Sequence, residues 1–185
     1  MAKKPQKKKW VPIVTEVPYF RQQELGETYV ATPEDAIGRP INVNLMYLLN
    51  DPKKQTITIR FRITKAKGEK VVAEITGLDT SAAYLKRLSK MSKGKAEQSL
   101  ALKTKDNVPI RIKVTAFVKH KSPRSTLTAI RKTIKEFLEK ETSTKNFDKL
   151  MQEIILQKTQ KDLYNMLKKT TRLTAVLVRA VRKLQ

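Results

Sequence analysis

The side chains that most often carry catalysis or bind metals are scarce in this chain. His120 is the only histidine, no cysteine occurs, and the 17 acids are scattered, with Glu34 and Asp35 the only adjacent pair. A neutral histidine base, a thiolate ligand set or a two-metal carboxylate cluster would each need groups that this pattern does not supply. The five glycines form no G-x-x-x-x-G-K-[ST] phosphate loop. We therefore predict no catalytic residue, no metal site, no cofactor and no small-molecule substrate.

Positive charge is the chemistry that the chain does offer. Forty Lys and Arg residues stand against 17 Asp and Glu residues, which leaves a formal net charge of +23. Such a chain repels itself, so we expect an anionic partner, and for a basic domain that partner is most often nucleic acid. No basic amphipathic helix dominates, and no apolar run approaches the roughly 18 residues of a membrane-spanning helix. We predict no membrane partner and, because no apolar signal core opens the chain, a cytoplasmic location.

The candidate nucleic-acid contacts lie in basic stretches that are poor in acids. The longest stretch, between Asp106 and Glu136, holds eight Lys or Arg residues. Phosphates attract such side chains, and unpaired bases stack on aromatic rings. Trp10 and His120 are candidates for stacking; a core anchor is the alternative for Trp10, and a merely solvated face the alternative for Arg60 and Arg62. The candidates for phosphate contact are Lys3, Lys4, Lys7, Lys8, Lys9, Arg60, Arg62, Lys86, Arg87, Lys90, Lys93, Lys95, Lys119, Lys121, Arg124, Arg131, Lys132, Lys168, Lys169 and Arg172.

The segment from Val108 to Lys135 is expected to position the centre of this surface. Residues 108–118 alternate as a strand does, with an apolar side at Ile110, Ile112 and Val114 and a basic side at Arg111 and Lys113. A basic turn over residues 119–125 follows. Next comes a helix over residues 126–140 that Thr126 or Ser125 could cap. We expect its apolar stripe to lie in the core and the opposite face of the segment to stay uniformly positive.

The remaining periodicity predicts an α+β fold. Helices are expected just after Asp79 or Thr80, at residues 147–155 and 163–167 after a break at 142–144, and as one turn at 46–49. The stripe at Phe147, Leu150 and Ile154 would pack in the core or against a protein neighbour. We predict a disordered basic arm over residues 1–10 and a single α+β RNA-binding domain over residues 11–185. Strands are expected at 11–17 (short or at an edge), 28–32, 41–45, 56–64, 71–76 (ended by Gly77), from 98 onward, and 173–184.

Several short motifs, in order along nearly the whole chain, resemble the S3Ae ("three-A-e") family of small-subunit ribosomal proteins of archaea and eukaryotes. The length resembles that of archaeal members. The motifs are Lys8-Lys9-Trp10, Leu25-Gly26-Glu27-Thr28, Gly38-Arg39 before Ile41-Asn42-Val43, Gly77-Leu78-Asp79, Phe117-Val118-Lys119-His120-Lys121, Ile130-Arg131-Lys132 and the run from Val178 to Leu184.

This resemblance implies a β-rich, barrel-like core of mostly antiparallel strands flanked by helices. It also implies a structural place in the platform of the small ribosomal subunit. The partners would be the 3′ region of the rRNA, neighbouring small-subunit proteins and mRNA near its exit. Two alternatives fit the charge alone. The first is a non-specific DNA-packaging protein, and the second is an RNA-processing enzyme whose carboxylates gather only in the folded chain.

Overall fold

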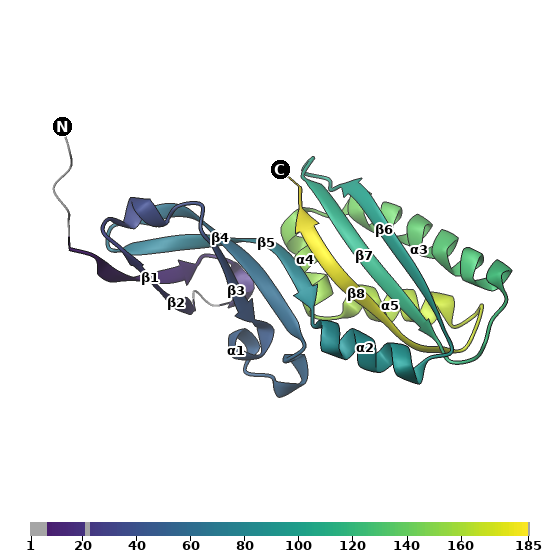
Figure 1. Ribbon diagram of the computed structural model, residues 1–185. Coiled ribbons are helices and arrows are strands. Elements are labelled where there is room, and N and C mark those ends of the chain that lie inside the picture. The colour runs from purple at the N-terminus through teal and green to yellow at the C-terminus, as the bar shows by residue number, and fades with distance from the viewer. Residues whose placement is uncertain (1–6, 21–22, 185) are drawn as a thin grey trace. The chain divides into compact units, whose positions relative to one another are not determined.

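Strand β5 (Lys70–Thr80) runs through the point at which the chain divides into two compact units, residues 1–77 and 78–185. The computed structural model describes residues 7–20 and 23–184 (Figure 1). The described residues contain both strands and helices in each unit, so the α+β prediction is confirmed. The predicted single domain over residues 11–185 stays a prediction, because a shared strand does not decide whether the two units fold together.

The first unit is a sheet in the order β2-β1-β5-β4-β3. The β1–β2 and β3–β4 pairs are antiparallel, and β1 runs parallel to β5. Alternate residues of β4 are buried, as the sequence predicted, and Phe61 meets Phe20 edge to face in the core. The elements are β1 (Lys9–Thr15), β2 (Glu24–Val30), β3 (Pro40–Asn44), α1 (Leu45–Leu49) and β4 (Ile57–Lys67), with short 3₁₀ turns at Pro18–Phe20, Pro33–Ala36 and Pro52–Lys54.

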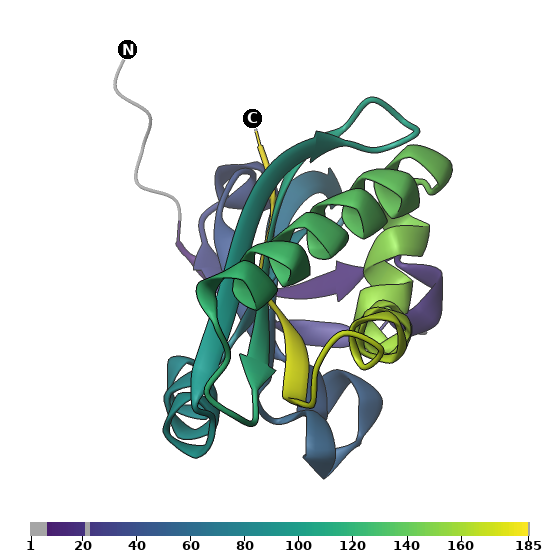
Figure 2. The same ribbon diagram turned by 90° about the vertical axis from the view of Figure 1, so that its right-hand side faces the viewer.

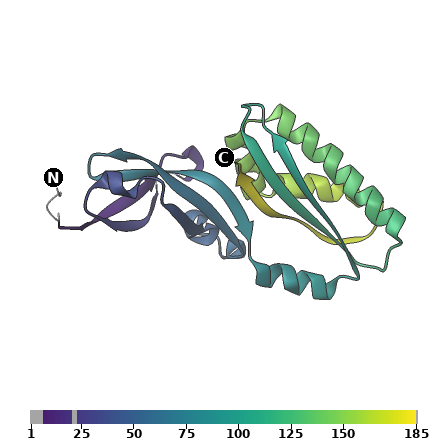
Figure 3. The same cartoon turned by 45° about the horizontal axis from the view of Figure 1, so that its top comes forward.

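The second unit has an antiparallel sheet in which β7 lies between β6 and β8. The end of β5 adjoins β8, where the Thr80 hydroxyl donates to the Val178 carbonyl at 2.8 Å. Helices α3, α4 and α5 lie on one side of the sheet and α2 lies on the other (Figures 2 and 3). The elements are α2 (Ala82–Met91), β6 (Gly94–Lys103), β7 (Pro109–Val118), α3 (Arg124–Thr144), α4 (Phe147–Ile155), α5 (Lys158–Leu167) and β8 (Leu173–Lys183).

The central segment matches its prediction on one face only. Ile110, Ile112 and Val114 are buried against the helices, but Thr115 and Phe117 on the opposite face are buried as well, beside α2. The expectation of a uniformly positive second face was therefore wrong for the half of β7 that α2 covers. The burial of Thr115 and Phe117 depends on tertiary packing, because α2 comes from another part of the sequence. The local pattern of β7 does not predict that a helix packs there.

Several predicted boundaries were also wrong. Helix α3 begins at Arg124 with Pro123 at its N-cap and no side-chain cap, so neither Thr126 nor Ser125 caps it. The predicted break at 142–144 is helical, and the hydroxyls of Thr142, Ser143 and Thr144 donate to carbonyls of the preceding turn, so they have partners within the helix. Gly77 is buried inside β5 and does not end it. The other differences are earlier starts of β2 and β6 and, within the predicted arm, a strand that already begins at Lys9.

Lys145 joins the ends of two helices in the second unit. Its amine pairs with Glu141 of α3 and Glu153 of α4, and all three side chains are about four-fifths buried. Burial opposes the charged amine, but hydrogen bonds to Glu141 and Glu153 and the charges of these carboxylates outweigh it. The pKa of Lys145 is therefore raised above its ordinary 10.5.

Replacing Lys145 with methionine should lower the free energy of unfolding by about 1–3 kcal/mol at pH 7, because two partly buried carboxylates lose their counter-ion. A raised lysine pKa stabilises the fold fully below 10.5 and loses its effect as the pH rises through the raised value. Urea unfolding should therefore show a difference from the wild type that shrinks above pH 10.5. The exposed Lys149, replaced in the same way, serves as the control. A difference that does not change with pH would contradict this role.

Candidate nucleic-acid interface

Three loops of the second unit meet at one end of its sheet. The strand register places Gly94 beside Val118 and Val118 beside Leu173. Backbone hydrogen bonds extend this pairing, since the Lys93 amide donates to Val118 at 3.0 Å and the Lys119 amide donates to Arg172 at 3.0 Å. The loop before β6, the turn after β7 and the loop before β8 are thus held side by side, at the lower right of the second unit in Figure 1.

These loops and the ends of their helices carry a cluster of exposed basic side chains, here called the basic end. Sequence reasoning proposed each of them, but only the strand register brings them together. No acid occurs in residues 80–96, 107–135 or 163–184, and none of the clustered cations forms an ion pair within the described residues. The basic end consists of Lys90, Lys93, Lys119, His120, Lys121, Arg124, Lys168, Lys169 and Arg172.

The start of α3 adds to the electrostatics of the basic end. Arg124 is the first residue of this helix, whose first turn contains no acid and has no side-chain cap. Helix N-termini favour anions, so a cation at this position is unfavourable until an anion binds nearby. A phosphate between Arg124 and the neighbouring lysines would relieve this repulsion and accept hydrogen bonds from them. The basic end is thus suited to a polyanion. Along α3, Lys132 is exposed and Arg131 is half-buried.

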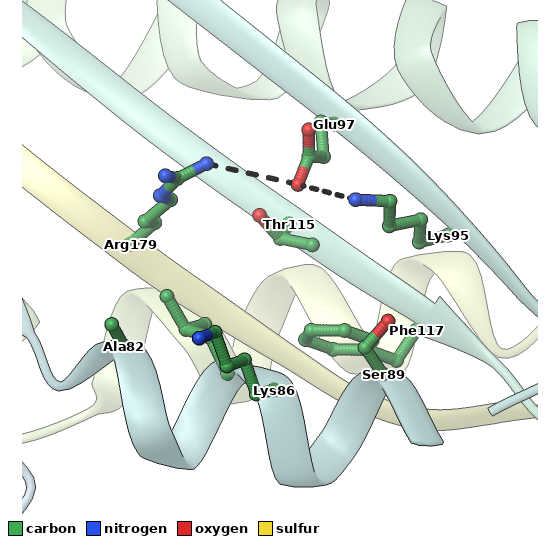
Figure 4. A pocket seen from close by; sticks show the side chains of 9 residues that line it. Ala82, Lys86, Ser89, Lys95, Glu97, Thr115, Phe117 and Arg179 are labelled. Atoms are coloured by element: carbon green, nitrogen blue, oxygen red, sulfur yellow. Dashed lines mark hydrogen bonds and ion pairs between the residues drawn. The ribbon is translucent and has the colours of Figure 1, made fainter. Parts of the chain in front are cut away.

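The remaining candidates of the second unit lie around α2. Lys86 and Lys95 line a hollow of about 210 Å³ between α2 and the sheet, together with Arg179 (Figure 4). Lys95 and Arg179 lie on either side of Glu97 at 3.4 and 3.8 Å, so this carboxylate partly neutralises both. The Arg87 guanidinium lies 5.1 Å from the centre of the Tyr84 ring. These cations are less available to a partner than those of the basic end.

The first unit holds the other predicted contacts in a different setting. Lys7 and Lys8 are exposed ahead of β1, and Trp10, within β1, is 65% exposed, so the core-anchor alternative for Trp10 was wrong. Arg60 and Arg62 are half-buried in the interior of β4, opposite residues of β3. Lys3 and Lys4 lie outside the described residues.

A further basic area lies on the open face of the sheet in the second unit, where sequence reasoning expected Arg111 and Lys113 but not Arg182. Arg111 and Arg182 are exposed and lie directly opposite each other, and Lys113 lies one pair further along the same face. Arg182 approaches Asp79 at 3.9 Å. The alternation of residues 108–118 placed Arg111 and Lys113 on one face, but only the β7–β8 register reveals that Arg182 joins them.

The described residues contain no cluster of His, Cys, Asp or Glu that could hold a metal ion, and no helix among them is long and apolar enough to cross a membrane. An α+β scaffold with an acid-free basic end is typical of the class of polyanion-binding proteins. The chain belongs to the ribosomal S3Ae family, whose model matches residues 2–185. This family consists of structural ribosomal proteins and not of enzymes, so the resemblance and the non-enzymatic prediction are both confirmed.

Archaeal relatives agree with the family match. A protein of Methanobrevibacter smithii named small ribosomal subunit protein eS1 is 29% identical over 88% of this chain and 83% of its own length. Proteins of the same name from Saccharolobus islandicus and Saccharolobus solfataricus are 28% identical over 88% of this chain and 77% of their own lengths.

Proposed function

We propose that this chain is a structural constituent of the small ribosomal subunit and binds its rRNA through the basic end. The observation that carries the binding site is the gathering of three acid-free loops at one end of the sheet, held by the pairs of Val118 with Gly94 and Leu173. The family match and the relatives support the ribosomal role. As a ribosomal protein, the chain acts in the cytoplasm.

The mechanism is electrostatic positioning without catalysis. Lysine and arginine side chains displace counter-ions from rRNA phosphates, which gives affinity that falls steeply with salt. Specificity comes from the folded shape of the RNA and from its unpaired nucleotides, because side chains cannot enter the deep major groove of an RNA helix. Strand pairing holds the backbone of the three loops side by side, so their flexible basic side chains reach phosphates that lie near one end of the sheet.

The finer location remains a proposal drawn from the family resemblance. It places the chain in the platform, against the 3′ region of the rRNA, with neighbouring small-subunit proteins and with mRNA near its exit. The predicted helical stripe does not supply a protein contact, since Phe147, Leu150 and Ile154 are all buried within the second unit. Any protein neighbour therefore meets another surface.

Sedimentation of a cell lysate through a sucrose gradient tests this function. The protein, followed by blotting, should migrate with the small subunit at low salt and stay with it at moderate salt. Nuclease digestion of DNA should leave its position unchanged. Migration at the top of the gradient, or with DNA, would overturn the ribosomal proposal and favour the DNA-packaging alternative.

A further inference from the structure

Two aromatic side chains lie side by side on the outer face of the first unit. Strand pairing places Trp10 of β1 directly opposite Tyr29 of β2. Their ring centres are 5.1 Å apart at an interplanar angle of 45°, so the rings touch each other. Trp10 is 65% exposed and Tyr29 is 49% exposed, so both present ring surface to solvent.

The position of this pair is fixed by the sheet and not by packing into a core. The neighbouring residues Val11 and Val30 point inward and are buried, which forces Trp10 and Tyr29 outward by the alternation of a strand. Large aromatic rings held in water forgo the free energy that burial would give them. A rigid, exposed aromatic pair is what a binding surface uses to cover a flat apolar ligand.

One cation lies beside the pair. The amine of Lys8 lies 6.0 Å from the centre of the Tyr29 ring, and the preceding residue, Lys7, is exposed. The Arg39 guanidinium, which donates to the Thr28 hydroxyl at 3.1 Å, lies toward the opposite face of the sheet, because Thr28 pairs with the buried Val11. The exposed carboxylate of Glu27 lies on the same face as the aromatic pair, opposite Pro12, and that of Glu24 lies further along it, opposite Val14. The amine of Lys8 thus lies next to exposed aromatic surface.

We propose that Trp10 and Tyr29 form a platform on which an unpaired RNA base stacks. Because the two rings already touch, the base does not enter between them but stacks on the free surface of Trp10. The flanking phosphate meets Lys8 and Lys7. An aromatic surface for a base beside a cation for its phosphate is the combination that recognises single-stranded nucleic acid. This inference rests on the proposed rRNA-binding function and adds to it a class of nucleotide, the unpaired one.

The chain contains a single tryptophan, so its fluorescence reports on Trp10 alone. We would titrate the full chain with a ten-nucleotide RNA of mixed sequence, as a single strand and annealed to its complement. The single strand should quench the emission of Trp10 and protect it from acrylamide. The duplex should do neither, although it carries more phosphates.

Variants separate the platform from general charge. Filter binding, which does not need the tryptophan, measures the affinity of the variants. Trp10→Ala and Tyr29→Ala should weaken binding of the single strand by about tenfold, as loss of a base-stacking ring does. Trp10→Phe should keep most of the affinity. Tyr47, in α1 and 69% exposed, provides the matched control, and Tyr47→Ala should bind as the wild type does. All of these side chains are exposed, so the variants should fold, which circular dichroism checks.

The outcomes distinguish this proposal from the function on which it rests. If the protein binds small-subunit rRNA but the single strand leaves Trp10 fluorescence unchanged, the proposal of a stacking platform is wrong. The proposed ribosomal function is then unaffected. Equal quenching by the duplex, or equal weakening of binding by Tyr47→Ala, would also overturn the platform. So would a Trp10 emission that changes when a ribosomal protein is added but not when RNA is added. If the protein binds neither the rRNA nor the single strand, both proposals fail.

Discussion

Replacing Lys119, Lys121 and Arg124 together with alanine is expected to weaken binding to small-subunit rRNA by roughly 10- to 100-fold at physiological salt. The three side chains are exposed and form no ion pair within the described residues, so their charge is available to phosphates. Each lost phosphate contact should reduce the slope of log affinity against log salt by roughly 0.7–0.9, or about 2–3 for the three together. Filter binding across a series of salt concentrations measures both quantities.

A matched variant separates location from net charge. Lys105, Lys140 and Lys149 are also exposed, and they lie in the β6–β7 turn, near the end of α3 and in α4, away from the basic end. Replacing these three with alanine removes the same charge and should leave affinity and salt slope nearly unchanged. Equal losses in both variants would mean that only the total charge matters. No loss in the first variant would mean that the β7–α3 turn is a solvated loop.

The sequence predicted best those features that depend on local periodicity. Alternating apolar residues in β4 and β7, and the stripe of Ile130, Ile134 and Leu138 in α3, are buried as expected. The β-branched run in residues 173–184 is β8, as predicted. Period and side-chain type act within a few residues, so these features can be inferred without knowing what lies across the fold.

Features that depend on distant partners could not be inferred. The basic stretches could be seen in the sequence. That they lie together at one end of the sheet follows from the pairing of Val118 with Gly94 and Leu173, and these three residues are far apart in the sequence. Trp10 was ambiguous for the same reason, because its neighbour Tyr29 comes from another strand. Thr142 looked like a helix breaker, yet it lies within α3, where its side chain is buried and its hydroxyl donates to the Leu138 carbonyl.

Loss of packing in the second unit is expected to destabilise both units together. Ile134 of α3 is fully buried in the second unit, and Ile134→Ala should cost about 2–5 kcal/mol through lost apolar contact and the cavity left behind. For a protein of this size, such a loss should lower the melting temperature by roughly 5–15 °C. Circular dichroism at 222 nm follows mainly α2–α5 of the second unit, whereas Trp10 fluorescence follows the first unit.

We expect both signals to shift together in the Ile134→Ala variant. Strand β5 is continuous from Lys70 to Thr80 and contributes residues to both units, so unfolding the second unit frees one end of a strand that the first sheet needs between β1 and β4. Ile134→Val, which removes one methylene, should cost only about 0.5–1.5 kcal/mol of unfolding free energy. Its melting temperature should therefore fall less than that of Ile134→Ala, and equally in both signals. If only the dichroism transition moves, the boundary at Gly77 separates two domains, and the single domain over residues 11–185 is wrong.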